Sequence, residues 1–286
     1  MISGRLNLIR IFTDSTSDLS QALVTERDIG VIPLRVHIGG ADFQDEFDFT
    51  PTDLFGQVEE CGEMPKTSAP SVGSFLEQFR REESSLYIGI SSQLSASVGN
   101  AKVAAKMLPE GHARVIDSRT LSSGIGLLAL LAADLRDAGH DLDEIERRVR
   151  DAVSRVKMSF VIDTMDYLYK GGRCTAIQHL VGSLLKLHPV ICALPDGTLD
   201  VKETLRGSRK RALRSLIADF EANRDAIDLR RVFVTHSAYP EGAETLTAAL
   251  SELAPIEELL VTEAGAVVSS HCGPKTIGIL YMTRSA

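Results

Sequence analysis

Apolar residues in the first half of the chain form short continuous runs, and stretches with helical spacing separate these runs. The runs lie at residues 8–12, 29–38, 86–90 and 114–116. Runs without alternation are typical of strands that are covered on both faces of a sheet. Between them, apolar residues repeat at helical spacing along residues 94–108, and again along residues 142–156. This alternation predicts a parallel α/β sheet with right-handed crossovers.

The second half of the chain shows shorter strands with tight turns. Residues 190–194 and 199–205 flank Pro195-Asp196-Gly197 and predict a hairpin. Helices are expected at residues 208–221 and 241–253, with further strands at residues 232–236, 256–263, 266–270 and 276–281. We therefore predict two domains, an N-terminal α/β domain of residues 1–160 and a C-terminal α+β domain of residues 161–286 with a mixed or antiparallel sheet.

The composition narrows the class of protein. A chain of 286 residues, 44% of them hydrophobic, suits one large or two modest domains. Its net charge of -8 argues against a general nucleic-acid binder, because such proteins neutralise phosphates with Lys and Arg. The longest strongly apolar stretch, residues 121–133, is too short to span a bilayer. It predicts a buried helix, so no integral membrane association is expected.

The lack of a signal-peptide pattern and the cysteine spacing favour a cytoplasmic protein. The first ten residues lack the apolar run and small-residue cleavage site of a signal peptide. No two of the four cysteines lie closer than eighteen residues, which excludes a CxxC pair and a zinc-finger spacing. The seven histidines are scattered and form no HExxH motif. We therefore expect a reduced protein without a metal site.

Hydroxyl-rich loops follow three of the predicted strands, at Asp14-Ser15, Ser91-Ser92 and Asp117-Ser118. In an open parallel sheet such loops gather at the carboxyl edge, where ligands usually bind. Helices that begin there direct free N–H groups and a positive dipole end at the ligand, which favours an anion. The loop of residues 67–71 adds hydroxyls before a predicted helix at residues 72–81. A single Ser or Thr is more often a helix cap than a ligand contact, but their concentration favours an anion site.

Seven short strings along the chain occur in the order typical of one family. They are FTDSTSDL (12–19), VIPL (31–34), KTSAPS (66–71), ISSQLSAS (90–97), VIDSRTLSSGIGLL (115–128), YKGGR (169–173) and HCGPKTIG (271–278). The ordered set resembles the DegV family. That resemblance implies a two-domain DegV-like α/β fold that holds a long-chain fatty acid in an apolar tunnel between the domains. It also implies a protein that needs no cofactor, is not an enzyme by itself, and presents the acid to a partner fatty acid kinase for phosphorylation to an acyl-phosphate.

The resemblance also implies which side chains hold the carboxylate. Thr67 of the TS-x-P motif and Ser95 of the S-S-x-L-S motif would hydrogen-bond it, and Ser68 and Ser92 of the same motifs are further candidates. His271, before the final Gly-Pro, would lie beside the same head group. Hydroxyl donors of this kind suit a carboxylate, which is ionised at neutral pH.

Basic residues supply the remaining candidates. By the resemblance, Arg173 of the GGR string and Arg206 after the hairpin face the head-group entrance or the kinase. Residues 202–214 hold six basic residues and one acidic residue, which indicates either a solvated helix face or a docking surface for an acidic partner. Lys275 stands where the family usually has Gly. Lys275 either donates to the head group or points to solvent from a turn that does not need a positive φ.

A serine-dependent lipid or ester hydrolase is the main alternative, because Ser91, Ser92, Ser95 and His271 are available. The nucleophile motif G-x-S-x-G is absent around Ser91. A nucleotide enzyme is less favoured, since the chain has neither a phosphate-binding P-loop motif nor a complete dinucleotide fingerprint.

Overall fold

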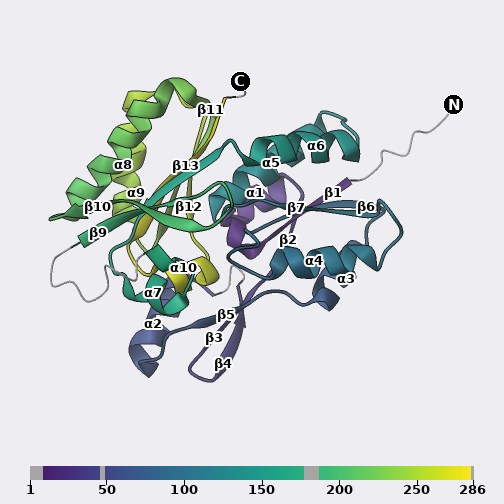
Figure 1. Ribbon diagram of the computed structural model, residues 1–286, viewed down its shortest axis with the longest axis horizontal. Coiled ribbons are helices and arrows are strands. Elements are labelled where there is room, and N and C mark those ends of the chain that lie inside the picture. Colours follow the sequence, from purple (N-terminus) through teal and green to yellow (C-terminus); the bar gives the residue numbers. More distant parts are fainter. Residues whose placement is uncertain (1–8, 46–48, 177–186, 285–286) are drawn as a thin grey trace.

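Two sheets, one parallel and one mixed, form the body of the computed structural model (Figure 1). The structure describes residues 9–45, 49–176 and 187–284. The predicted strand start at residue 8 lies outside these residues, as do most of the ten residues considered for a signal peptide. The predicted α/β fold, with a parallel sheet in the first half and a mixed sheet in the second, is confirmed.

The first sheet has the strand order β2-β1-β6-β7, and all its pairs are parallel. Its strands are β1 (Ile9–Asp14), β2 (Ile29–Ile32), β6 (Ser84–Gly89) and β7 (Ala113–Asp117). Its helices are α1 (Gln21–Glu26), α3 (Val72–Phe79), α4 (Ser97–Lys106), α5 (Ser123–Asp137) and α6 (Leu142–Val153). Ile11 faces the α5 side and its neighbour Phe12 faces α3 and α4, so both faces of the sheet are buried. This double cover explains the continuous apolar runs.

The second sheet has the order β10-β9-β8-β13-β11-β12 and is antiparallel except for the β11–β12 pair. Its strands are β8 (Val156–Val161), β9 (Leu187–Ala193), β10 (Leu199–Arg206), β11 (Ile227–Ser237), β12 (Glu258–Glu263) and β13 (Thr276–Thr283). Helices α8 (Arg209–Asn223) and α9 (Pro240–Leu253) cover one face. The predicted hairpin is confirmed as β9–β10, and Gly197 supplies the positive φ of its turn.

Helix α5 is packed between the two sheets. Its apolar residues share one cluster with Ile11 and Leu86 of the parallel sheet and with Phe160 and Leu280 of the mixed sheet. The predicted buried helix at residues 121–133 is therefore confirmed. Among the described helices, none is both long and apolar enough to cross a membrane.

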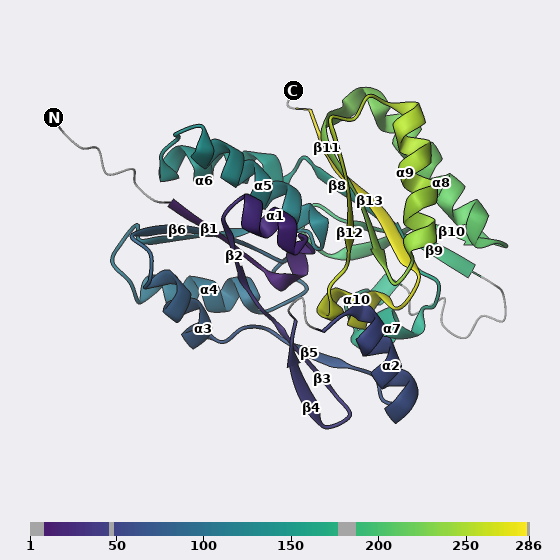
Figure 2. The ribbon, with the colours of Figure 1, turned by 180° about the vertical axis from the view of Figure 1, so that it is seen from behind.

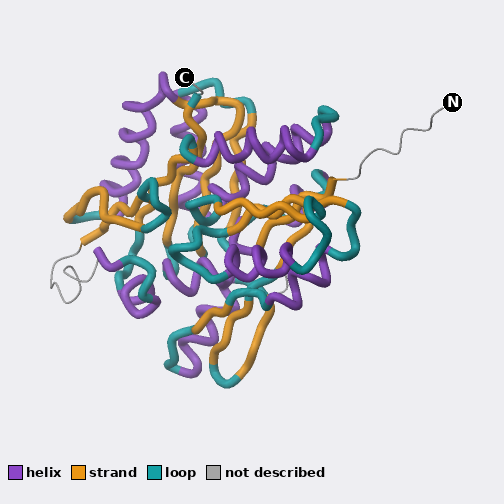
Figure 3. The backbone as a smooth tube through the Cα atoms, turned by 45° about the vertical axis from the view of Figure 1, so that its right-hand side comes forward, coloured by secondary structure: helices purple, strands orange, loops and turns teal. Residues whose placement is uncertain are grey.

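A three-stranded ribbon, made of β3 (Arg35–Ile38), β4 (Ala41–Gln44) and β5 (Lys66–Ser68), projects from the body of the molecule (Figure 3). Helix α2 (Pro51–Cys61) lies beside it, as Figure 2 shows. The apolar face of the ribbon packs Val36 and Ile38 against Ala266 and Val267, which belong to the second half of the chain. The ribbon therefore connects the two halves.

Residues 266–270, predicted as a strand, instead belong to helix α10 (Ala266–Cys272), so that prediction is wrong. The run is buried on nearly every side, Ser269 and Ser270 included, and such a run carries no period that separates helix from strand. Tertiary contacts determine that these residues form a helix. The carboxylates of Asp18 and Asp45 accept the N–H groups of Gly265 (2.8 Å) and Val267 (3.1 Å) at the start of the helix.

The chain leaves the parallel sheet after β7 and enters the mixed sheet at β8, which begins at Val156. The division into residues 1–160 and 161–286 stays a prediction. Helix α7 (Asp166–Gly171) follows β8 and packs against α10.

Lys275 has a φ of 59°, so the turn keeps the left-handed conformation although glycine is missing. The suggestion that this turn does not need a positive φ is therefore wrong. The side chain is exposed, while the backbone N–H donates to the Ser237 carbonyl at 2.7 Å. The backbone therefore fixes this turn, at the expense of strain in a residue with a β-carbon.

We expect Lys275→Gly to raise the free energy of unfolding by about 0.5–1 kcal/mol. The substitution relieves about 1–2 kcal/mol of left-handed strain and loses about 0.4–1 kcal/mol through a more flexible unfolded chain. Urea denaturation of both proteins measures the difference. A less stable variant would show that the lysine side chain contributes more than its backbone conformation costs.

Candidate ligand-binding site

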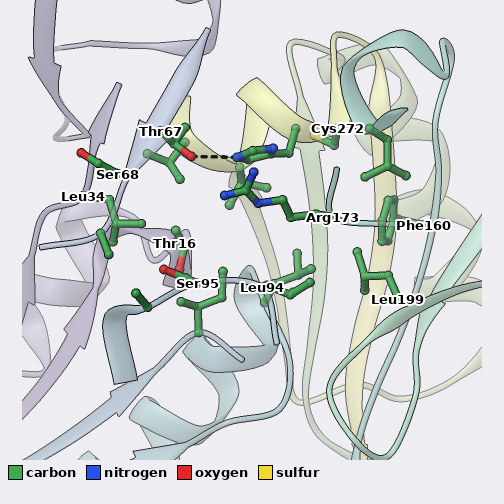
Figure 4. A pocket seen from close by; sticks show the side chains of 18 residues that line it. Thr16, Leu34, Thr67, Ser68, Leu94, Ser95, Phe160, Arg173, Leu199 and Cys272 are labelled. Carbon is green, nitrogen blue, oxygen red and sulfur yellow. Dashed lines mark hydrogen bonds between the residues drawn. The ribbon is translucent and has the colours of Figure 1, made fainter. Parts of the chain in front are cut away.

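A cavity of about 270 Å³ lies where the ribbon, α10, α7 and the two sheets meet. This volume is just under the range of about 300–1,000 Å³ that is usual for small-molecule sites. Figure 4 shows Thr16, Thr67, Ser95 and Arg173 around one part of it, and Phe160, Leu199 and Cys272 at another. The remaining lining is mostly apolar: Leu34, Ala69, Ile90, Leu94, Ala96, Leu121, Leu168, Val267 and Val268.

One hydrogen bond joins the ribbon to α10 inside the cavity. Thr67 Oγ1 lies 2.8 Å from His271 Nε2, although the residues are 204 positions apart in the chain. Thr67 stands on β5 opposite Val36 of β3, and His271 stands in the last turn of α10. The Arg173 guanidinium lies beside the same pair (Figure 4). Three of the predicted head-group residues therefore come together.

The imidazole of His271 is neutral over most of the accessible pH range. Burial, together with the nearby charge of Arg173, lowers the pKa of His271 to about 4. Because the unfolded chain binds this proton near pH 6.5, the contribution of His271 to stability is present above that pH and is lost as the pH falls toward 4. The formal positive charge at this end of the cavity therefore belongs to Arg173.

Ser95 lies at the other side of the polar group, in the loop between β6 and α4. Its hydroxyl lies 2.9 Å from Ser97 Oγ and accepts the N–H of Ser97, the first residue of α4, at 3.3 Å. The side chain is half-buried and lines the cavity. Ser95 therefore combines a local hydrogen bond at the start of α4 with a position in the cavity wall.

Thr16, which is not among the predicted contacts, also lines the cavity. Its hydroxyl donates to the buried Asp14 carboxylate, which also accepts from Tyr87 Oη (2.6 Å) and from the Ile90 N–H (3.1 Å). Burial raises the pKa of Asp14. Asp14 thus shapes the loop that presents Thr16. The hydroxyl-rich string after the first strand was the available signal.

The functional groups of Ser68, Ser92 and Arg206 lie outside the polar group around Thr67. Ser68 borders the cavity, but alternation along β5 turns its hydroxyl to the opposite face, where it lies 2.9 Å from His37 Nε2 (Figure 4). Ser92 is exposed, and its N–H donates to Asp117 at 3.2 Å. Arg206 is exposed at the end of β10. None of the three hydroxyl or guanidinium groups takes part in the polar group around Thr67.

The serines considered for a hydrolase are occupied in other ways. Ser91 is buried, and its hydroxyl donates to the Gly197 carbonyl at 2.7 Å. Ser68, His37 and Asp42 do lie in a row on the outer face of the ribbon, where Ser68 Oγ is 2.9 Å from His37 Nε2 and His37 Nδ1 is 3.0 Å from Asp42 Oδ1. Arg35 binds the same Asp42 carboxylate. This series is directed away from the cavity and therefore does not equip it for nucleophilic attack.

The apolar end of the cavity continues into a chamber of about 40 Å³. The two spaces share Leu121, Phe160, Val268 and Cys272. Met158 and Leu280, from β8 and β13, line the chamber beyond them. Burial raises the pKa of the Cys272 thiol to about 12, so it is an uncharged wall group. The site thus pairs a polar end with an apolar end.

An outer cavity of about 410 Å³ adjoins the polar end and shares Ser95 and Arg173 with the main cavity. Its lining also includes the exposed residues Gln93, Gly172 and Thr175 and the half-buried Thr198. Within the described residues, no group of three or more His, Cys, Asp or Glu side chains could hold a metal ion. The arrangement is therefore suited to an amphipathic anion that enters from this side.

Similarity to known sequences extends along nearly the whole chain. A family model described as an uncharacterised protein of the DegV family matches residues 8–284. A DegV domain-containing protein of Clostridium perfringens is 30% identical over 282 residues, covering 95% of this chain and 96% of that protein. A second such protein, from Caldanaerobacter subterraneus, is 32% identical over 279 residues, covering 96% and 98%.

Solved structures show the same fold. A DegV family protein from Thermus thermophilus, whose structure is described as fatty acid binding, is similar with a TM-score of 0.88 and 32% identity, over 96% of this chain and 99% of that chain. DegV from Bacillus subtilis, described as a fatty acid binding protein, gives a TM-score of 0.84 at 26% identity, over 96% and 99%. From sequence and fold together, the chain belongs to the DegV family.

Proposed function

We propose that this protein binds a long-chain fatty acid and presents it to a fatty acid kinase, which phosphorylates the carboxylate. The observation that carries the proposal is a cavity with Thr67, His271 and Arg173 at one end and an apolar chamber beyond Phe160 at the other. The Thermus thermophilus and Bacillus subtilis relatives, described as fatty acid binding, support the same ligand class.

The carboxylate lies among the hydroxyls of Thr67 and Ser95, beside His271 and Arg173. Each well-formed hydrogen bond to a charged group contributes about 1.5–3 kcal/mol. The guanidinium of Arg173 supplies the opposite charge, and its exposed position keeps the desolvation cost of that charge low. The outer cavity beside Ser95 and Arg173 leaves a route by which a second protein reaches the head group.

The tail accounts for most of the gross binding energy. At about 0.8 kcal/mol per buried CH2, roughly fifteen methylenes supply on the order of 12 kcal/mol before ordering and association costs. The tail runs past Phe160 into the chamber, which Met158 and Leu280 help to line. These two side chains limit the length of the acyl chain.

We expect Thr67→Val combined with Ser95→Ala to weaken binding of oleate at least about a hundredfold, because two charge-assisted hydrogen bonds are lost. Equilibrium binding of radiolabelled oleate measures the change, and thermal unfolding checks that the fold is kept. Ser68→Ala is the matched control, since its hydroxyl points to His37, and it should bind as the wild type does. Unchanged binding in the double variant would place the head group elsewhere.

A basic surface near the head-group end suits an acidic region of the kinase. Arg206, Lys210, Arg211 and Arg214 are exposed on β10 and α8. Arg209 has a different role: it pairs with Asp163, lies 4.8 Å from the centre of the Tyr239 ring, and donates to the Lys275 carbonyl at 3.4 Å. Through Arg209, the start of α8 is fixed next to the turn that follows α10.

Charge reversal tests this docking surface without touching the cavity. Arg211→Glu with Arg214→Glu should raise the apparent KM of a purified bacterial fatty acid kinase for the acid-loaded protein about tenfold or more, and leave oleate affinity unchanged. The control is Lys102→Glu with Lys106→Glu, which makes the same change in net charge on the exposed face of α4. Equal KM values for the two double variants would exclude a specific role for α8.

A serine-dependent hydrolase is supported less well. The cavity places Thr67, not a serine, beside His271, and His271 Nδ1 has no carboxylate partner among the described residues. Such a pair binds an oxygen ligand but lacks the third group that orients the base of a triad.

A further inference from the structure

Helices α7 and α10 interlock through two glycines, and the contact surrounds His271. A β-carbon on Gly171, the last residue of α7, would overlap His271 Nδ1 and lie 3.3 Å from Cε1 of the same ring. In the opposite direction, a β-carbon on Gly273 would lie 2.8 Å from the ring of Tyr167 on α7. Each helix therefore places an aromatic ring against a glycine of the other.

The two ring nitrogens of His271 have different surroundings. Nε2 lies 2.8 Å from Thr67 Oγ1, while Nδ1 is buried and has no hydrogen-bond partner among the described residues. A proton on Nδ1 would be a buried donor without an acceptor, facing only the hydrogen that Gly171 carries in place of a side chain. The structure therefore favours the tautomer with the proton on Nε2, which donates to Thr67 Oγ1.

We propose that Gly171 is the positioning residue for His271. Its bare Cα holds the imidazole so that Nε2–H donates to Thr67 Oγ1, which leaves the hydroxyl proton of Thr67 free for a ligand oxygen. The position of the imidazole concerns the protein alone, whereas the role of the Thr67 hydroxyl toward a ligand rests on the fatty acid function proposed above. A methyl group at position 171 would overlap the imidazole, so the ring must shift from this position.

The rest of the turn after α7 fits this role. Gly172 has a φ of 67° and ends the helix, and a β-carbon there would meet nothing within 4 Å. Arg173 then turns back, and its Nη1 donates to the Gly171 carbonyl at 2.5 Å. The turn thus fixes the residue that backs His271 and brings the guanidinium to the cavity.

Two neighbouring substitutions separate ring displacement from general loss of stability. Gly171→Ala is not strained in its backbone but meets the imidazole. Gly172→Ala is strained by its left-handed φ but meets open space, so it destabilises the turn without moving the ring. The comparison therefore reports on the contact with His271.

Nitrogen NMR of the ligand-free protein tests the position and tautomer of His271, with His271→Gln to assign the signals. The wild type and Gly172→Ala should show a protonated Nε2, an unprotonated Nδ1, and a pKa near the value of about 4 set by burial. In Gly171→Ala we expect mixed tautomers and a pKa that moves toward 6.5. A wild-type Nδ1–H signal would overturn the proposal, even if the variant did not fold. Unchanged His271 signals in a folded Gly171→Ala would also overturn it.

Oleate binding separately tests whether the Thr67 hydroxyl donates to the ligand. Gly171→Ala should bind about tenfold or more weakly, as expected for one lost hydrogen bond to a charged group, and Gly172→Ala, which disturbs only the turn that carries Arg173, should weaken binding less. If the His271 signals change as expected but oleate affinity does not, the positioning role stands and the placement of the carboxylate at Thr67 is refuted. Equal weakening in both variants would overturn the link between Gly171 and the ligand.

Discussion

The contact between the ribbon and helix α10 is the constraint on which the cavity depends. At one end of α10, Asp18 and Asp45 accept the N–H groups of Gly265 and Val267. At the other end, His271 meets Thr67 of the ribbon. Burial raises the pKa of both carboxylates, that of Asp45 to about 6, so these groups are retained at a cost in stability. We infer that this cost is tolerated because it fixes the helix that carries the head-group histidine.

The two halves of the chain supply different parts of one site. Loops at the carboxyl ends of the parallel strands, with the ribbon that follows β2, provide hydroxyl groups. The mixed sheet provides the apolar wall through Met158, Phe160 and Leu280. Because α5 fills the space between the sheets elsewhere, the cavity is confined to the end where α10 and the ribbon meet. A neutral imidazole and alcohol groups, without a base held in place by a carboxylate, make this site better suited to holding an acid than to attacking an ester.

Sequence reasoning reached the two-sheet architecture and four residues that line the cavity, Thr67, Ser95, Arg173 and His271. It failed where the answer depended on tertiary contacts. The buried run at residues 266–270 looks like a strand until the capping carboxylates of Asp18 and Asp45 are seen. Ser68 shares a motif with Thr67, yet strand alternation sends its hydroxyl to the other face. The contact between Gly171 and His271 could not be predicted from the sequence, because it joins segments one hundred positions apart.

Mass spectrometry of an organic extract tests the central claim most directly. The protein is purified under native conditions, extracted with solvent, and the extract is quantified against the amount of protein. The account predicts a long-chain fatty acid in near-stoichiometric amount, which exchanges with added palmitate or oleate. An extract without fatty acid, from a folded protein that takes up neither added acid, would contradict it.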